Sequence, residues 1–183
     1  MGGRVTRRGF LRLTGFSAGM LTLSRLRPLP AALAAETGAG ATGLTVLTPA
    51  DARILAAVAE RITATGDPAM PRFAQTDGLR TIDTALRPLP PEVPHQLSWA
   101  LWLFEYAPPL FIGKPARFTG LEPAWQDVYV ADWADSGLQT RRQVFQALKN
   151  LSMLGYYTQD ATWAGIHYGG PLAPRPRRVV ADA

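Results

Sequence analysis

The sequence predicts an all-α fold, a small irregular helical bundle with long loops rich in proline and glycine. Apolar residues recur at spacings of three and four in several stretches, whereas no stretch alternates convincingly with period two. The 183 residues include 17 Gly and 16 Pro, which separate these stretches. Cys is absent, which excludes disulfides, Cys-ligated zinc, iron–sulfur clusters and thiol catalysis.

The first helix is expected over residues 49–64, because Thr48 offers a capping hydroxyl and Pro49 suits the first helical position. Its apolar residues share one face: Ile54, Leu55, Val58 and Ile62. A shorter helix is expected over 76–87, with Thr76 as its cap. The Pro-rich residues 87–94 are expected to cross the surface in an extended form.

Residues 96–106 are apolar on nearly all sides, so this helix is expected to be covered all round before Pro108 ends it. A loop should follow over 111–120, and then a helix over 122–136 with Trp125 and Trp133 in the core. The clearest helix is predicted over 139–157. Its apolar stripe comprises Val144, Phe145, Leu148, Leu151, Ser152 and Leu154, with Arg141, Arg142, Gln146, Lys149 and Asn150 placed elsewhere on the helix.

The net charge of +5 suggests nucleic acid as a partner, but the distribution of the charge argues against it. Residues 1–35 hold six Arg and no acid, and three more Arg lie in the tail. Residues 36–172 carry 10 basic and 13 acidic residues, so the body is mildly acidic. The predicted organisation is a leader (1–35), a flexible linker (36–47), a helical domain (48–172) and a disordered Pro/Arg-rich tail (173–183).

The N-terminus resembles a twin-arginine (Tat) export signal, a basic motif followed by a weakly apolar segment. The motif residues are Thr6, Arg7, Arg8, Phe10, Leu11 and Arg12. Ala32-Leu33-Ala34 supplies an A-x-A site, so cleavage is expected before Ala35, and retention as an N-terminal anchor is the alternative. Such a signal predicts a periplasmic location and the Tat translocase as a partner. Because this route exports folded, often cofactor-loaded proteins, either this chain or its partner is expected to hold a cofactor. A basic arm for nucleic acid or lipid is the rival interpretation.

The inventory for catalysis is thin. His95 and His167 stand far apart without a metal-ligand spacing, and no nucleotide or nucleophile motif is present after the leader. Asp127, Asp132 and Asp135 share a helical region but are more typical of a solvated face. By contrast, 14 of the 17 aromatic residues lie between Trp99 and Tyr168, a concentration that favours a protein interface.

The C-terminal half resembles the gluconate 2-dehydrogenase subunit 3 family, the small subunits of FAD-dependent sugar and alcohol dehydrogenases. The resemblance covers residues 48–172 and is strongest over 117–171. It rests on Arg117-Phe118, Trp133-Ala134-Asp135-Ser136, Arg141-Arg142-x-x-Phe145-x-x-Leu148-Lys149, Gly155-Tyr156-Tyr157 and Trp163 followed by Tyr168-Gly169-Gly170-Pro171. His167 stands where many members have Gly, which puts the tight turn there in question.

The resemblance implies a non-catalytic subunit of a periplasmic dehydrogenase complex. Its partner would be a leaderless flavoprotein of the glucose–methanol–choline type, often joined by a cytochrome c subunit. FAD, and haem c where that subunit is present, would belong to the partners, and no cofactor or metal is expected in this chain. This chain would associate with the membrane through the complex or through an uncleaved leader.

Partner contact is expected on the aromatic C-terminal segment, where glycines permit close approach. The expected interface residues are Tyr156, Tyr157, Trp163, His167, Tyr168, Gly169, Gly170 and Pro171. The alternative is a segment folded onto its own bundle. Two other functions stay open: an independent periplasmic enzyme using His95, His167 or the aspartates, and a general export chaperone or scaffold.

Overall fold

The computed structural model describes residues 43–170, and all of its regular structure there is helical. This confirms the predicted all-α class. The leader with its motif and cleavage site, residues 36–42, Pro171 and the tail lie outside the described residues.

The described chain contains seven α-helices and two 3-10 helices. Their bounds are α2 Pro49–Ile62, η2 Phe73–Gln75, α3 Gly78–Leu86, α4 Glu92–Tyr106, α5 Pro108–Phe111, η3 Phe118–Gly120, α6 Pro123–Ala134, α7 Gln139–Tyr157 and α8 Asp160–Trp163. The longest, α7, has the predicted bounds, because its pattern of core residues continues without a break.

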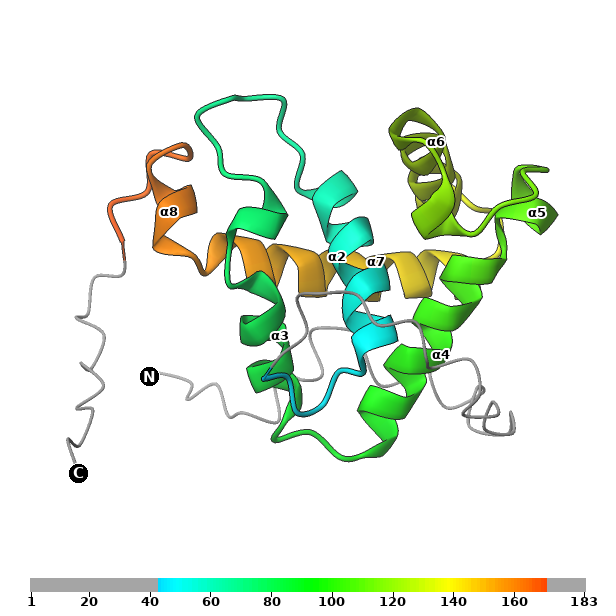
Figure 1. Ribbon diagram of the computed structural model, residues 1–183, viewed down its shortest axis with the longest axis horizontal. Coiled ribbons are helices and arrows are strands. Elements are labelled where there is room, and N and C mark those ends of the chain that lie inside the picture. Colours follow the sequence, from blue (N-terminus) through cyan, green and yellow to red (C-terminus); the bar gives the residue numbers. More distant parts are fainter. Residues whose placement is uncertain (1–42, 171–183) are drawn as a thin grey trace, which may run out of the picture.

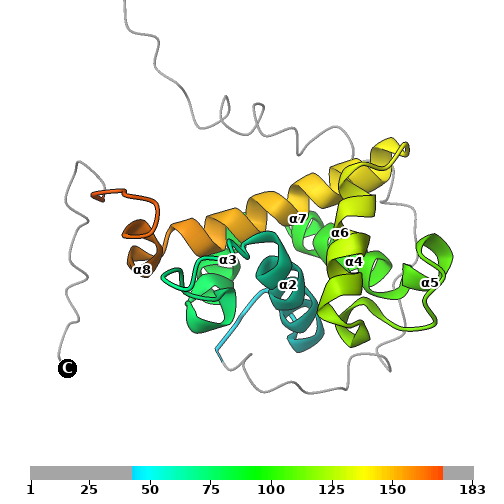
Figure 2. The ribbon, with the colours of Figure 1, turned by 90° about the horizontal axis from the view of Figure 1, so that it is seen from above.

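Helix α7 forms one side of the bundle. It packs against α2, α3 and α6, and α2 also packs against α4 and α6 (Figures 1 and 2). The short α8 lies at one end of α7, whereas α5 and α6 lie toward the other end (Figure 1).

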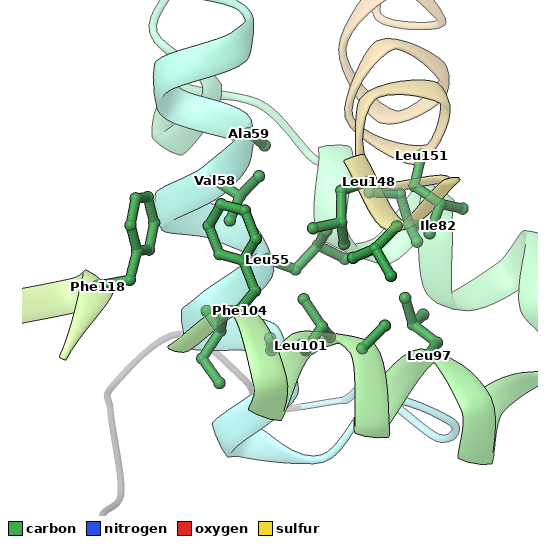
Figure 3. Packing of buried hydrophobic residues seen from close by; sticks show 14 of the residues in the cluster. Leu55, Val58, Ala59, Ile82, Leu97, Leu101, Phe104, Phe118, Leu148 and Leu151 are labelled. Atoms are coloured by element: carbon green, nitrogen blue, oxygen red, sulfur yellow. The ribbon is translucent and has the colours of Figure 1, made fainter. Parts of the chain in front are cut away.

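The core lies where α2, α3, α4 and α7 meet, and η3 closes one side of it (Figure 3). Its centre consists of fully buried aliphatic side chains together with Phe104 and Phe118, whose rings meet edge to face at 4.9 Å. Tyr129 and Trp133 of α6 extend this aromatic group, and the Tyr129 hydroxyl donates to the Phe104 carbonyl at 2.9 Å. Burial raises the pKa of Tyr129, so this phenol stays a neutral donor.

Helix α2 begins as predicted, since the Thr48 hydroxyl accepts from the Asp51 amide at 3.1 Å. The body starts earlier than expected, however. Asp83 of α3 is buried and accepts from the amides of Thr45, Val46 and Leu47 at 2.8–3.1 Å. The end of the predicted linker is therefore part of the packed domain.

Two helices begin at different residues from those predicted. The Thr76 hydroxyl donates to the Phe73 carbonyl, which closes η2, and also accepts from the Gly78 amide at 3.3 Å. It therefore contacts the start of α3, but the N-cap residue is Asp77 and α3 starts at Gly78. Helix α4 starts at Glu92, inside the stretch expected to be extended. Pro94 is accommodated in its first turn, where a backbone N–H has no helical partner to lose.

Helix α4 is covered less evenly than predicted. Leu97, Leu101 and Phe104 are buried, whereas Trp99, Trp102 and Tyr106 on the opposite side are half-buried and contact one another. The outer rings therefore shield each other, and the Arg117 guanidinium lies over the Tyr106 ring at 4.9 Å.

Burial also corrects three predictions about side chains. Trp125 is 38% exposed beneath the Lys114 ammonium, so it is not in the core. Leu154 is 40% exposed, at the edge of the α7 stripe. Arg141 is buried, because its guanidinium lies over the Phe111 and Trp133 rings and pairs with Asp132. Trp133 is buried as expected, and Phe145 packs half-buried against the core.

Candidate docking surface

The C-terminal segment begins with a residue that belongs to the core. Tyr156 is 1% exposed, and its hydroxyl donates to the Pro71 carbonyl at 2.6 Å. Burial, together with the nearby Tyr157 and Glu60, raises the pKa of Tyr156. This corrects the prediction for Tyr156, which holds the end of α7 to the loop after α2 and presents no surface to a partner.

The segment after α7 is fixed to the bundle through its inner side. The Gln159 amide donates to the Thr81 hydroxyl of α3 at 3.0 Å, and Thr162 is fully buried. Gly165 packs so closely on Met70 that a Cβ there would overlap the thioether. The inner side of the segment is thus folded onto its own bundle, which is the alternative to partner contact that the sequence left open.

Its outer side nevertheless presents aromatic rings. The Trp163 indole donates to the Tyr157 carbonyl at 3.0 Å, and its ring meets Tyr168 edge to face at 5.4 Å. Trp163 and Tyr157 are half-buried, whereas Tyr168 is 48% exposed. These contacts fix the rings while leaving part of each at the surface.

The tight turn questioned at His167 is present. His167 has φ +53°, in the left-handed region where Gly is preferred, and its amide donates to the Ala164 carbonyl at 3.2 Å. Both His167 and Gly169 are exposed. Gly170, at φ +93°, lies against Trp163, and a Cβ there would come within 3.1 Å of the indole ring. The backbone thus turns back over the aromatic pair.

These residues define what we call the C-terminal surface. It comprises apolar side chains of the last turns of α7, of α8 and of the segment after α8: the exposed Met153, Leu154, Ile166 and Tyr168, and the half-buried Tyr157 and Trp163. Met153 was not predicted. A helical wheel could have found it, because Met153 and Tyr157 are four residues apart and fall opposite Leu148 and Leu151.

A second group of exposed apolar residues lies toward the other end of α7. Leu110 is 79% exposed and Leu138 61%, and Val128 stands with Trp125 on the outside of α6. These side chains come from α5, from α6 and from the loop before α7. Substitutions in this second group can therefore serve as controls for substitutions in the C-terminal surface.

The structure does not bring the candidate catalytic residues together. His95 lies in the first turn of α4 and His167 in the turn after α8. Asp127 pairs with Arg61 at 2.6 Å and Asp132 pairs with Arg141, while Asp135 is exposed at the end of α6. Their carboxylates therefore hold helices together or face solvent.

An open hollow of about 570 Å³ lies beside the loop after α2. Its charged wall includes Glu60, which pairs with Arg72 at 2.5 Å and accepts from the Ala74 amide. Elsewhere, buried Glu105 accepts from the amide and hydroxyl of Thr119. Within residues 43–170, no three His, Asp or Glu side chains are grouped as metal ligands.

Two further findings concern membrane-spanning helices and relatives of the chain. In the part that the structure describes, no helix is both long enough and apolar enough to cross a membrane. No protein-family model, curated protein or solved structure matches the chain.

Proposed function

We propose that this chain is the non-catalytic small subunit of a periplasmic FAD-dependent dehydrogenase of the glucose–methanol–choline type. It would carry the export signal for a leaderless flavoprotein and stabilise that large subunit. The sequence resemblance and the twin-arginine motif support this assignment, and the C-terminal surface is the proposed place of contact. FAD, and haem c where a cytochrome subunit takes part, would reside in the partners.

The observation that carries the proposal is the rigid presentation of Trp163 and Tyr168. Large aromatic side chains contribute most to binding when they are already held in one arrangement, because little conformational entropy is then lost. The Tyr157 carbonyl, the edge-to-face contact and Gly170 hold this pair without burying it.

The rival proposal is an independent exported enzyme. It would need His95, His167 or the aspartates of α6 to act on one substrate. Turnover of a sugar, alcohol or ester by the purified chain alone would favour it, whereas activity found only with the flavoprotein would favour the subunit assignment.

The test is binding of the full chain to a leaderless flavoprotein of the glucose–methanol–choline type, sought in the reading frames next to the gene for this chain. Ile166→Ala together with Tyr168→Ala removes exposed apolar area without disturbing the core. We expect at least a tenfold rise in Kd, about 1.4 kcal/mol. Leu110→Ala is the matched control, because it truncates an exposed side chain toward the other end of the bundle. Equal affinity of all three proteins would contradict the proposed surface.

The export role has a separate test. Replacing Arg7 and Arg8 by Lys should leave the flavoprotein's activity in the cytoplasm, measured after separating the periplasmic fraction. Unchanged periplasmic activity would contradict export through this chain, whatever the result for the C-terminal surface.

A further inference from the structure

The outer face of α7 is open along the described body. Helices α2, α3 and α6 pack on the other side of α7, and Figure 2 shows no described helix beyond it. The outer face is formed by residues at helical spacing: Arg142, Gln146, Lys149, Asn150, Met153 and Tyr157. Because Met153 and Tyr157 also belong to the C-terminal surface, the two surfaces are continuous.

This face has a charge opposite to that of the body. Residues 43–170 carry 10 basic and 12 acidic residues, yet α7 contains no Asp or Glu. Arg141 turns inward to Asp132, which leaves Arg142 and Lys149 as the charges of the outer face. They are seven residues apart, about 10 Å along the helix.

Arg142 is held in position. Its guanidinium donates to the Ser136 carbonyl while the side chain stays exposed. Lys149 has no acidic partner within the described residues. The two cations are therefore available to carboxylates on another molecule.

The dimensions suit a protein partner. Helix α7 has 19 residues, hence a length of about 28 Å, similar to the width of an interface that buries about 800 Å² per partner. Gln146 and Asn150 add amide donors and acceptors, which recognise directional groups of a protein. An anionic membrane is recognised by larger basic clusters, typically about four to eight Lys or Arg.

We infer that the outer face of α7 extends the partner interface and docks on an acidic surface of the flavoprotein. Carboxylates of the partner lie opposite Arg142 and Lys149, and its apolar groups meet Met153 and Tyr157. This inference rests on the proposed function and adds the charge and the position of the partner's docking surface.

The test measures the association rate of the full chain with the flavoprotein at increasing NaCl concentration. Arg142→Gln with Lys149→Gln should slow association about fivefold at low salt and flatten its salt dependence, because steering depends on these charges. Thr84→Glu with Ala85→Glu on the exposed side of α3 is the control, since it changes net charge by the same amount. Lys149→Gln alone removes no intramolecular hydrogen bond among the described residues. Its association rate should depend on NaCl concentration less steeply than that of the wild-type chain and more steeply than that of the double variant.

The outcomes separate the two proposals. If the double variant associates with the wild-type salt dependence, the acidic docking surface is wrong while the subunit assignment stands. If the wild-type chain forms no complex at all, the proposed function fails and the inference fails with it. If the wild-type chain binds vesicles of anionic phospholipid and the double variant does not, the face belongs to a membrane surface and the inference is overturned.

Discussion

Asp83 is the side chain whose removal should most clearly alter the stability of the body. Its buried carboxylate accepts three successive backbone amides, of Thr45, Val46 and Leu47, and also pairs with Arg87 at 3.1 Å. Asp83→Asn preserves the shape but places an amide donor against these donors. The expected result is a lower free energy of unfolding.

The size of the loss follows from the hydrogen bonds. Burial disfavours the charged carboxylate, but the bonds from Leu47, Val46, Thr45 and Arg87 outweigh it and hold the pKa of Asp83 well below its usual range. Hydrogen bonds to a charged group contribute about 1.5–3 kcal/mol each, and the Asn oxygen retains some of them. We therefore expect Asp83→Asn to cost about 2–4 kcal/mol at pH 7.

The same arrangement predicts a pH dependence. Because the pKa is lower in the folded state, the stabilisation is fully present above the unfolded value, about 4, and is lost as pH falls through the folded value. Urea unfolding followed by tryptophan fluorescence should show the difference between the wild-type chain and Asp83→Asn shrinking below about pH 4. Asp77→Asn, at an exposed residue without a side-chain cap bond, is the control. A difference that stays constant from pH 7 to pH 3 would refute the reasoning.

Two further predictions concern the backbone of the C-terminal half. In Gly155→Ala the new Cβ would lie 2.9 Å from the Gly78 carbonyl oxygen, a clash costing about 1–3 kcal/mol that exceeds the gain in helix propensity of about 1 kcal/mol. The melting temperature of Gly155→Ala should therefore fall. Gly120→Ala is the control, because a Cβ there meets nothing within 4 Å and the melting temperature should hardly change. Equal melting temperatures of the two variants would contradict the close packing at Gly155. His167→Gly should raise stability by up to about 1 kcal/mol, since φ is +53° there, and a loss measured by urea unfolding would show that the histidine side chain stabilises the turn.

The interface residues show where sequence reasoning about the site stopped. The concentration of aromatic residues placed Tyr156, Tyr157, Trp163 and Tyr168 in one segment. Which of these rings contact one another, and which are buried, depends on where the chain turns. Tyr156 is buried in the core, where its hydroxyl donates to the carbonyl of Pro71, a residue 85 positions earlier in the sequence. Tyr157, the next residue on the helix, is rotated outward as a consequence.

Local signals set much of the fold. The bounds of α7 follow from the spacing of its own apolar residues, and the start of α2 follows from the Thr48 cap on the Asp51 amide, so both could be predicted. The start of α4 could not, because a Pro-rich stretch can continue either as extended chain or as the first turn of a helix.

The sequence by itself determined the helical class, the separation of the basic ends from a mildly acidic body, and the concentration of aromatic residues toward the C-terminus. Only the tertiary structure decided which of those residues form the core. Trp133 is enclosed by α4 and α5 through Phe104 and Phe111, whereas Trp125 on the same helix lies outside. Periodicity tells which residues share a face of a helix, but the face that is buried depends on neighbouring elements that contribute their contacts from far along the chain.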